Sequence, residues 1–356
     1  MLASILRWTD AHVRNLRGSQ RKTLAYRVCG LMRGGRAGVA AIGRAMPGEA
    51  YVKHKIKRVD RFLGNQRVEM ATVSRALSSW EAASGQRLVL AMDWTDLPGD
   101  KKMLTLAIPT RGRAIPVHSR VVVLKVMYKS QNNLEVGLIR EMLVLLPAGI
   151  KPVIVADRGF GRTRLMKTLK SLGVSFVLRV QEKVIVRHAG RKHVLRDLRP
   201  RRGQTTHLKR VEYRDEDAVN ITMVLTWRHK MKEAWLLATD LQDKPSEIIA
   251  HYGRRMQIEE TFRDTKSVRW GFKLRHVRLS SSERFERIMM VVALAYLFLL
   301  AVGTQAERHK RHRRFMANTS ARRTLSWLTL GRQVLKEYKR RLASCVRDLR
   351  PALVTL

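Results

Sequence analysis

Apolar and polar positions between residues 88 and 180 alternate in blocks that predict short strands and two helices. RLVLAMDWT, MLTLAIPT and AIPVHSRVVVL are apolar runs of strand length separated by turn residues, and KPVIVAD and VSFVLRV have the same character. Between them, Ser130 to Leu146 has apolar residues at helical spacing, and GFGRTRLMKTLKSLG reads as a helix closed by Gly173. This order predicts an α/β domain with a mixed sheet.

Residues 1 to about 85 have a helical pattern and a basic charge. A Pro-Gly break at Pro47 separates a short helix from a second one, so this part resembles a helix-turn-helix DNA reader. A solvated basic helix in a helical cap explains the same pattern, and the two readings stay open. The candidate DNA-binding cations of the second helix are Lys53, Lys55, Lys57, Arg58 and Arg61.

Beyond residue 180 the alternation stops. Residues 181 to about 240 predict β-rich, basic material, which we interpret as an insertion, and one long helix from Lys244 to about Val268 follows. The apolar run from Ile288 to Val302 is fifteen residues long, short of the ~18–20 that a membrane span needs. We therefore expect a buried core helix there and no membrane. The tail after Gly303 is very basic, and either a DNA backbone or solvent suits it.

Charge narrows the class of partner. The 356 residues hold 71 Lys and Arg against 29 Asp and Glu, a formal net charge of +42. Such a charge favours nucleic acid, with an anionic membrane surface second, and makes an enzyme for small neutral substrates improbable. The two cysteines, Cys29 and Cys345, are too far apart in sequence for a disulfide framework or a cysteine zinc site, which fits a reducing cytosol.

The predicted long helix carries a polar stripe. In HYGRRMQIEETFRDTK, four side chains fall within about 60° of one another around a regular helix, and Arg263 joins them. One carboxylate among four donors is a poor core face. It suits a charged surface, or a site that grips phosphate beside a metal-binding carboxylate. The four side chains are Tyr252, Arg255, Glu259 and Lys266.

Two aspartates stand on apolar strands, where a carboxylate is costly unless it is paired or metal-bound. Asp93 directly follows LVLAM, and Asp157 ends VIVAD, where ligand sites of open α/β sheets gather. Together with Glu259 they could hold two Mg²⁺ ions about 3.5–4 Å apart. Each has a plain alternative: Asp157 as a cap at Gly159, and Asp96 and Glu260 as rivals of Asp93 and Glu259.

These residues carry a resemblance. The spacing Y-x₂-R-x₃-E-x₆-K, with Asp93 in DWT and Asp157 in ADRGFGR, is similar to the YREK signature of the DDE transposases of the insertion-sequence-four family. The resemblance covers about 93–303 through motifs. It implies a ribonuclease H-like fold with a β-rich insertion before the glutamate. Asp93, Asp157 and Glu259 would be catalytic metal ligands, and Tyr252, Arg255, Lys266 and Arg263 would bind DNA phosphates.

The resemblance also implies a reaction. Members of the family cut double-stranded DNA at the terminal inverted repeats of their element and join the freed ends to target DNA, as a dimer on two paired ends. The cofactor would be two Mg²⁺ ions, with Mn²⁺ as a substitute. Some members flip a base onto a tryptophan of the insertion, where Trp227 and Trp235 lie, although a strand core role suits each better.

The sequence therefore predicts a DNA transposase of the bacterial cytoplasm, associated with the nucleoid. Its parts would be a helical DNA-binding region at 1–85, a ribonuclease H-like mixed-sheet catalytic core at 86–303 with a β-rich insertion at about 181–240, and a basic tail at 304–356. Two alternatives stay open. One is a ribonuclease H-like nuclease that cuts without joining, and the other is a catalytically idle DNA-binding protein derived from a transposase.

Overall fold

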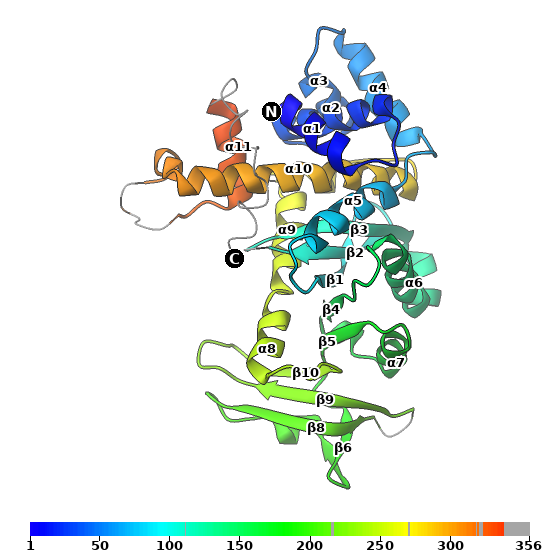
Figure 1. The fold of residues 1–356 in the computed structure, drawn as a ribbon, viewed down its shortest axis with the longest axis vertical. Helices are drawn as coiled ribbons and strands as arrows, with labels where there is room; N and C mark the ends of the chain where they lie inside the picture. Colours follow the sequence, from blue (N-terminus) through cyan, green and yellow to red (C-terminus); the bar gives the residue numbers. More distant parts are fainter. Residues whose placement is uncertain (111, 215–216, 270, 318, 320–322, 338–356) are drawn as a thin grey trace.

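A computed structural model describes residues 1–110, 112–214, 217–269, 271–317, 319 and 323–337 (Figure 1). The described part is a mixed α/β protein built around one ten-stranded sheet. Its strand order is β3-β2-β1-β4-β5-β10-β9-β8-β6-β7.

The helical character predicted for the N-terminal region is confirmed. A short turn that includes Pro47 separates α3 from α4, as the Pro-Gly break indicated. Figure 1 shows α1 to α4 gathered at one end of the molecule, on the far side of α10 from the sheet, whereas α5 lies on the sheet side and contacts β3. The helices of this region are α1 (Leu2–His12), α2 (Gly18–Gly34), α3 (Val39–Ala45), α4 (Val52–Gly64) and α5 (Met70–Ala82).

The strands predicted between residues 88 and 180 are also confirmed. β1, β2 and β3 pair antiparallel, β4 pairs parallel with β1, and β5 pairs parallel with β4. All four residues of β4 are buried, as expected for a central parallel strand covered on both faces. The bounds are β1 (Val89–Asp96), β2 (Lys101–Pro109), β3 (Ala114–Val123), β4 (Val153–Ala156) and β5 (Ser175–Arg179).

Two helices lie on one side of these strands in Figure 1, α6 (Leu124–Leu145) and α7 (Thr163–Ser171). The prediction placed the start of α6 at Ser130. The helix instead begins at Leu124, and Ser130 has non-helical backbone angles (φ −149°, ψ 25°) that kink it. Gly173 has a φ of +66° and closes the turn after α7, as its position predicted.

The region at 181–240 is β-rich, as predicted, but it does not form a sheet of its own. β10 pairs antiparallel with β5, and the remaining strands extend the same sheet from there. Since β5 pairs with β4 in the sheet, this extension lies close to the strands that carry the aspartates. Its strands are β6 (Ile185–His188), β7 (Arg191–Val194), β8 (Thr205–Tyr213), β9 (Val219–Thr226) and β10 (Trp235–Thr239).

The single long helix predicted from Lys244 is wrong, because the chain forms two helices. They are α8 (Pro245–Gly253) and α9 (Met256–Lys266). At the junction the N–H of Arg255 donates to the carbonyl of Tyr252, three residues back, so the turn is tighter than an α-helical one. Gly253 precedes the junction, and glycine weakens a helix interior by roughly 1 kcal/mol. The break shifts the side chains that the sequence placed on one continuous stripe.

The apolar run 288–302 lies in α10 (Ser282–Arg308), which is the buried core helix that the sequence predicted. The helix is long and apolar enough to span a membrane, but its apolar window is 89% buried inside the protein. The helix α11 (Trp327–Glu337) packs against it through glycines. A Cβ atom at Gly331 would lie 2.2 Å from the carbonyl oxygen of Leu299, so the two backbones need glycine to approach. The predicted boundary at 303 falls inside α10, and residues 338–356 of the basic tail lie outside the described residues.

Candidate active site

Asp93 lies near the carboxyl end of β1, where its side chain is only 17% exposed. Its Oδ1 accepts a hydrogen bond of 2.8 Å from the backbone N–H of Trp94. The rival Asp96 is 77% exposed and lies 3.3 Å from the amino group of Lys102. Asp93 is therefore the aspartate of β1 that is held in a buried setting.

The electrostatic setting of Asp93 favours its neutral form. Burial raises the pKa of its carboxyl from 3.8 to about 7, the nearby guanidinium of Arg255 opposes the rise, and the carboxylates of Asp157 and Glu259 add to it. The three acids thus lie close enough to repel one another. Such a group gains from a bound cation, because the cation removes the repulsion.

Asp157 directly follows β4. β1 and β4 are parallel, and Met92 pairs with Ala156. The next residues along the two chains, Asp93 and Asp157, are therefore neighbours on adjacent strands. The capping alternative is also realised, since Asp157 Oδ1 accepts a 2.9 Å hydrogen bond from the N–H of Gly159. This bond fixes the carboxylate at the strand end and is compatible with a second role.

Glu259 lies in the first turn of α9 and forms an ion pair with Arg255. The same guanidinium lies 3.7 Å from Asp93, so it stands between two of the acids. Arg255 is buried, and its Nε has no hydrogen-bond partner among the described residues. The rival Glu260 faces elsewhere and pairs with Arg263 at 2.8 Å. Arg255 is thus the counter-charge of the site.

The other residues of the predicted stripe have different surroundings in the structure. Tyr252 is buried and contacts the ring of Trp235 edge-on at 4.8 Å between centroids. Lys266 is half-buried in the last turn of α9, and burial lowers the pKa of its amino group against the opposing pull of Asp96 and Asp93. Arg263 does not join the group: it is 72% exposed and pairs with Glu260. The pairing with Glu260 accounts for the position of the Arg263 guanidinium.

A cavity of about 450 Å³ opens beside these residues. Asp157, Tyr252, Arg255 and Glu259 line it, and β5 and the turn between β9 and β10 supply cations. These cations were not predicted from the sequence, although Arg179 ends β5 next to Asp157 and obeys the same strand-end rule. Arg179 and Arg158 both pair with Glu233, at 2.9 and 3.7 Å. The missed cations are Arg158, Arg179, Lys230 and Lys232.

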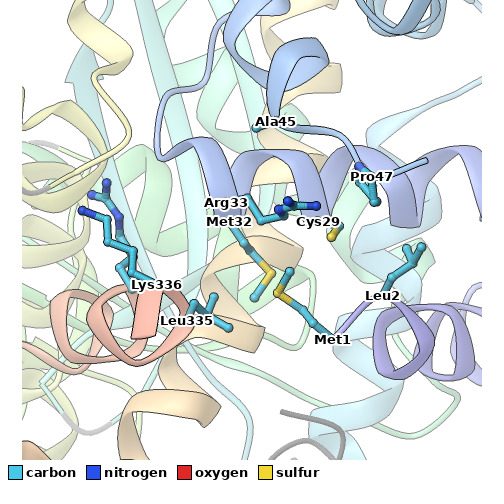
Figure 2. Close-up of a pocket in the computed structure, with 10 residues that line it drawn as sticks. Met1, Leu2, Cys29, Met32, Arg33, Ala45, Pro47, Leu335 and Lys336 are labelled. Carbon is cyan, nitrogen blue, oxygen red and sulfur yellow. The ribbon is translucent and has the colours of Figure 1, made fainter. Parts of the chain in front are cut away.

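A second cavity, of about 430 Å³, lies between the N-terminal helices and α11 (Figure 2). Met1, Leu2 and Met32 line it together with Cys29, and no carboxylate is among the described residues around it. Burial raises the pKa of the Cys29 thiol to about 11, so this thiol is a poor nucleophile at neutral pH. The described lining therefore does not offer the groups that acid–base or metal chemistry needs.

The donor atoms of the three acids suit a hard divalent ion, but the positions of the side chains do not. Asp93, Asp157 and Glu259 offer only oxygen donors, which Mg²⁺ and Mn²⁺ prefer. Within the described residues, however, no three His, Cys, Asp or Glu side chains are grouped closely enough to hold a metal ion. The guanidinium of Arg255 lies between Asp93 and Glu259 and is their cationic partner in this structure.

The remaining predicted DNA contacts lie in two places. On α4, Lys53, Lys57, Arg58 and Arg61 are exposed and Lys55 is half-buried. In the β-rich region Trp227 packs beneath the guanidinium of Arg199, 5.2 Å from its ring centroid, and Trp235 packs on Tyr252. Both tryptophans are half-buried, so part of each ring is accessible.

Comparison with known families places this geometry in context. A family model described as a transposase DDE domain matches residues 84–298 of the chain, which include all three acids and the sheet from β1 to β10. No curated protein matches the chain.

Proposed function

The chain belongs to the transposase DDE domain family, and on that premise we propose how it acts. It binds the terminal inverted repeats of its own mobile element, cleaves the DNA ends and transfers the strands to target DNA. Asp93, Asp157 and Glu259 are the catalytic acids. We place it in the insertion-sequence-four branch because Tyr252, Arg255, Glu259 and Lys266 have the spacing of the YREK signature.

One observation carries the proposal. The parallel register of β1 and β4 sets Asp93 beside Asp157, and the guanidinium of Arg255 joins Asp93 to Glu259 on α9. A buried guanidinium that pairs with two acids from different elements is costly to maintain for stability alone. A site that exchanges this internal cation for metal ions accounts for the arrangement.

The three acids would hold two Mg²⁺ ions. When bound, these ions would activate a water or a 3′-hydroxyl and stabilise the leaving oxygen of a phosphodiester. Asp157 is oriented for this role by its bond to the Gly159 N–H, and Asp93 by its bond to the Trp94 N–H. Arg255, released from Glu259, would turn to a DNA phosphate, which a guanidinium binds in a bidentate manner.

The cavity beside the acids suits a DNA strand. Arg179, Lys230 and Lys232 line it with Tyr252, and this cationic wall would face the phosphates near the cut. Lys266 would bind a neighbouring phosphate, and the exposed Arg263 one further out along the duplex. Trp235, next to Tyr252, is the better placed of the two tryptophans to stack on an unpaired base, and Trp227 is the second candidate.

The order β3-β2-β1-β4-β5 supports a ribonuclease H-like core within 86–303, with 181–240 as its β-rich insertion. Residues 1–85 would recognise the inverted repeats through α4, and 304–356 would add basic contacts. Two copies would act together on paired double-stranded ends, in the bacterial cytoplasm on the nucleoid. A membrane plays no part in this proposal.

The test uses the DNA that flanks the gene. Linear DNA carrying both flanks is incubated with the protein, Mg²⁺ and a supercoiled target plasmid. Cleavage at the flank ends together with joined products supports the transposase. Cleavage without joined products indicates the ribonuclease H-like nuclease, and tight binding without cleavage indicates the idle DNA-binding protein. DNA of equal length without the flanks is the control.

A further inference from the structure

A fourth carboxylate lies close to the site. Glu135 is on α6, and its side chain is 0% exposed. It takes no part in the proposed mechanism. Because a buried carboxylate is costly unless it is fully bonded, its contacts indicate what it does.

Both oxygens of Glu135 have partners. Oε1 accepts hydrogen bonds from the indole N–H of Trp94 at 2.9 Å and from the side-chain amide of Gln131 at 3.0 Å. Oε2 forms an ion pair with Arg162. Gln131 belongs to the same helix, whereas Trp94 and Arg162 belong to two other segments of the chain.

Those two segments carry the aspartates of the site. Trp94 is the residue after Asp93 on β1, and Arg162 is the residue before α7, five positions after Asp157. Successive side chains of a strand point to opposite faces, so Asp93 meets Arg255 on one face while Trp94 meets Glu135 on the other. Glu135 thus fastens both acid-bearing segments from the face opposite α9.

We propose that Glu135 is a positioning residue, whose two oxygens hold Trp94 and Arg162 and through them set the separation of Asp93 and Asp157. The inference rests on the proposed function of the three acids. Arg162 contributes to the same clamp, and its guanidinium also lies 5.9 Å from the ring centroid of Phe160 in the segment after Asp157. The residue orients the acids without touching DNA or metal.

A simpler role for Glu135 would be to neutralise the charge of the half-buried Arg162. Glu135→Gln tests between the two, because glutamine keeps one acceptor but cannot bond Trp94 and Arg162 together. For a partner that orients metal ligands, metal affinity falls roughly 10- to 100-fold when it is lost. We expect a rise of that size in the Mn²⁺ dissociation constant measured by calorimetry, with a similar loss of cleavage rate and unchanged affinity for flank DNA.

Glu141→Gln is the matched control. Glu141 lies on the same helix and also pairs with an arginine, Arg120, but away from the acids. We expect its Mn²⁺ affinity and cleavage rate to equal those of the wild type. Equal Mn²⁺ affinity in wild type and Glu135→Gln would overturn the positioning role. Absence of cleavage by the wild type would instead count against the proposed function.

A second variant keeps the inference testable if Glu135→Gln folds poorly. The double variant Glu135→Gln/Arg162→Met removes the buried ion pair as a unit, so thermal stability should recover relative to the single variant. We expect its Mn²⁺ affinity to stay low because Trp94 and the Asp157 segment are still unfastened. Recovery of both stability and Mn²⁺ affinity would show that Glu135 only neutralises Arg162.

Discussion

Arg255 lies 3.7 Å from Asp93, between Nη1 and Oδ2, and this contact joins the start of α9 to the end of β1. The same guanidinium pairs with Glu259, so one buried cation serves two acids from different elements. In the proposed mechanism metal ions replace Arg255 as the cations that neutralise these acids. We predict that a metal ion and DNA replace these side-chain contacts.

Replacing Arg255 with glutamine distinguishes the two cations that could neutralise the acids, the guanidinium of Arg255 and a bound metal ion. Removing one partner of a buried ion pair costs about 3–5 kcal/mol, so Arg255→Gln should lower the melting temperature without metal at pH 8. Mg²⁺ should then raise the melting temperature more than in the wild type, because the acids have lost their internal cation. Arg263→Gln, at an exposed pair, is the control. An equal Mg²⁺ response in Arg255→Gln and the wild type would contradict the exchange.

The raised pKa of Asp93 predicts a dependence of stability on pH. The folded state binds the proton more tightly than the unfolded chain, since the pKa is about 7 against 3.8. This contribution is complete below pH 4 and is lost as the pH rises through 7. Relative to Asp93→Asn, the wild type should lose up to about 4 kcal/mol of unfolding free energy between pH 4 and pH 8, three pKa units at 1.36 kcal/mol each. Urea unfolding with a chelator measures it, and a difference that is flat with pH would refute it.

The exposed cations of α4 predict a change in salt dependence. Each lost phosphate contact reduces the slope of log affinity against log salt by about 0.9. The triple variant Lys53→Gln/Lys57→Gln/Arg58→Gln should therefore bind flank DNA more weakly, with a slope less steep by up to about 2.7. Lys151→Gln is the control, because Lys151 precedes β4 at the end away from Asp157. An unchanged slope in the triple variant would favour the solvated-helix reading.

The crossing of α10 and α11 predicts a stability effect at one glycine. Gly331→Ala would place a methyl group 2.2 Å from the carbonyl oxygen of Leu299. Overpacking of this kind costs about 1–3 kcal/mol, which thermal unfolding would detect. At Gly137, in α6, a methyl group would meet no described atom within 4 Å apart from the adjacent residues and the helix's own backbone, so Gly137→Ala should instead stabilise the protein by up to about 1 kcal/mol. Equal effects of the two substitutions would contradict the packing described for α11.

Much of the fold could be predicted because the sequence pattern of its first five strands is distinct. Each strand from β1 to β5 is a compact apolar run bounded by turn residues, and the stretch Ile288–Val302 of α10 is apolar around its whole circumference. The placement of Asp93 beside Asp157 also follows from sequence, since a strand-end rule and one parallel register are enough. These features depend on local pattern and need no knowledge of distant contacts.

The rest depended on contacts that periodicity does not encode. The turn at Arg255 replaces regular helical bonds, so the sequence predicted one long helix where the chain forms α8 and α9. Glu135 occupies a buried position on α6 where an apolar residue is the ordinary expectation, and its long-range partners Trp94 and Arg162 explain it. Arg179 lies at the site because β10 pairs with β5 and the turn before β10 brings Glu233 to it. Such long-range pairings are set by the assembled sheet.

The central claim is that Glu259, with the two aspartates, holds the catalytic metal ions. The most direct measurement is single-turnover cleavage of flank DNA in Mg²⁺ by Glu259→Gln and by Glu260→Gln. The two glutamates are adjacent, but Glu260 pairs with Arg263 and Arg113 outside the site. We predict a loss on the order of 10²–10³-fold or more for Glu259→Gln and a rate near that of the wild type for Glu260→Gln. Equal rates for the two variants, or a larger loss for Glu260→Gln, would contradict the account.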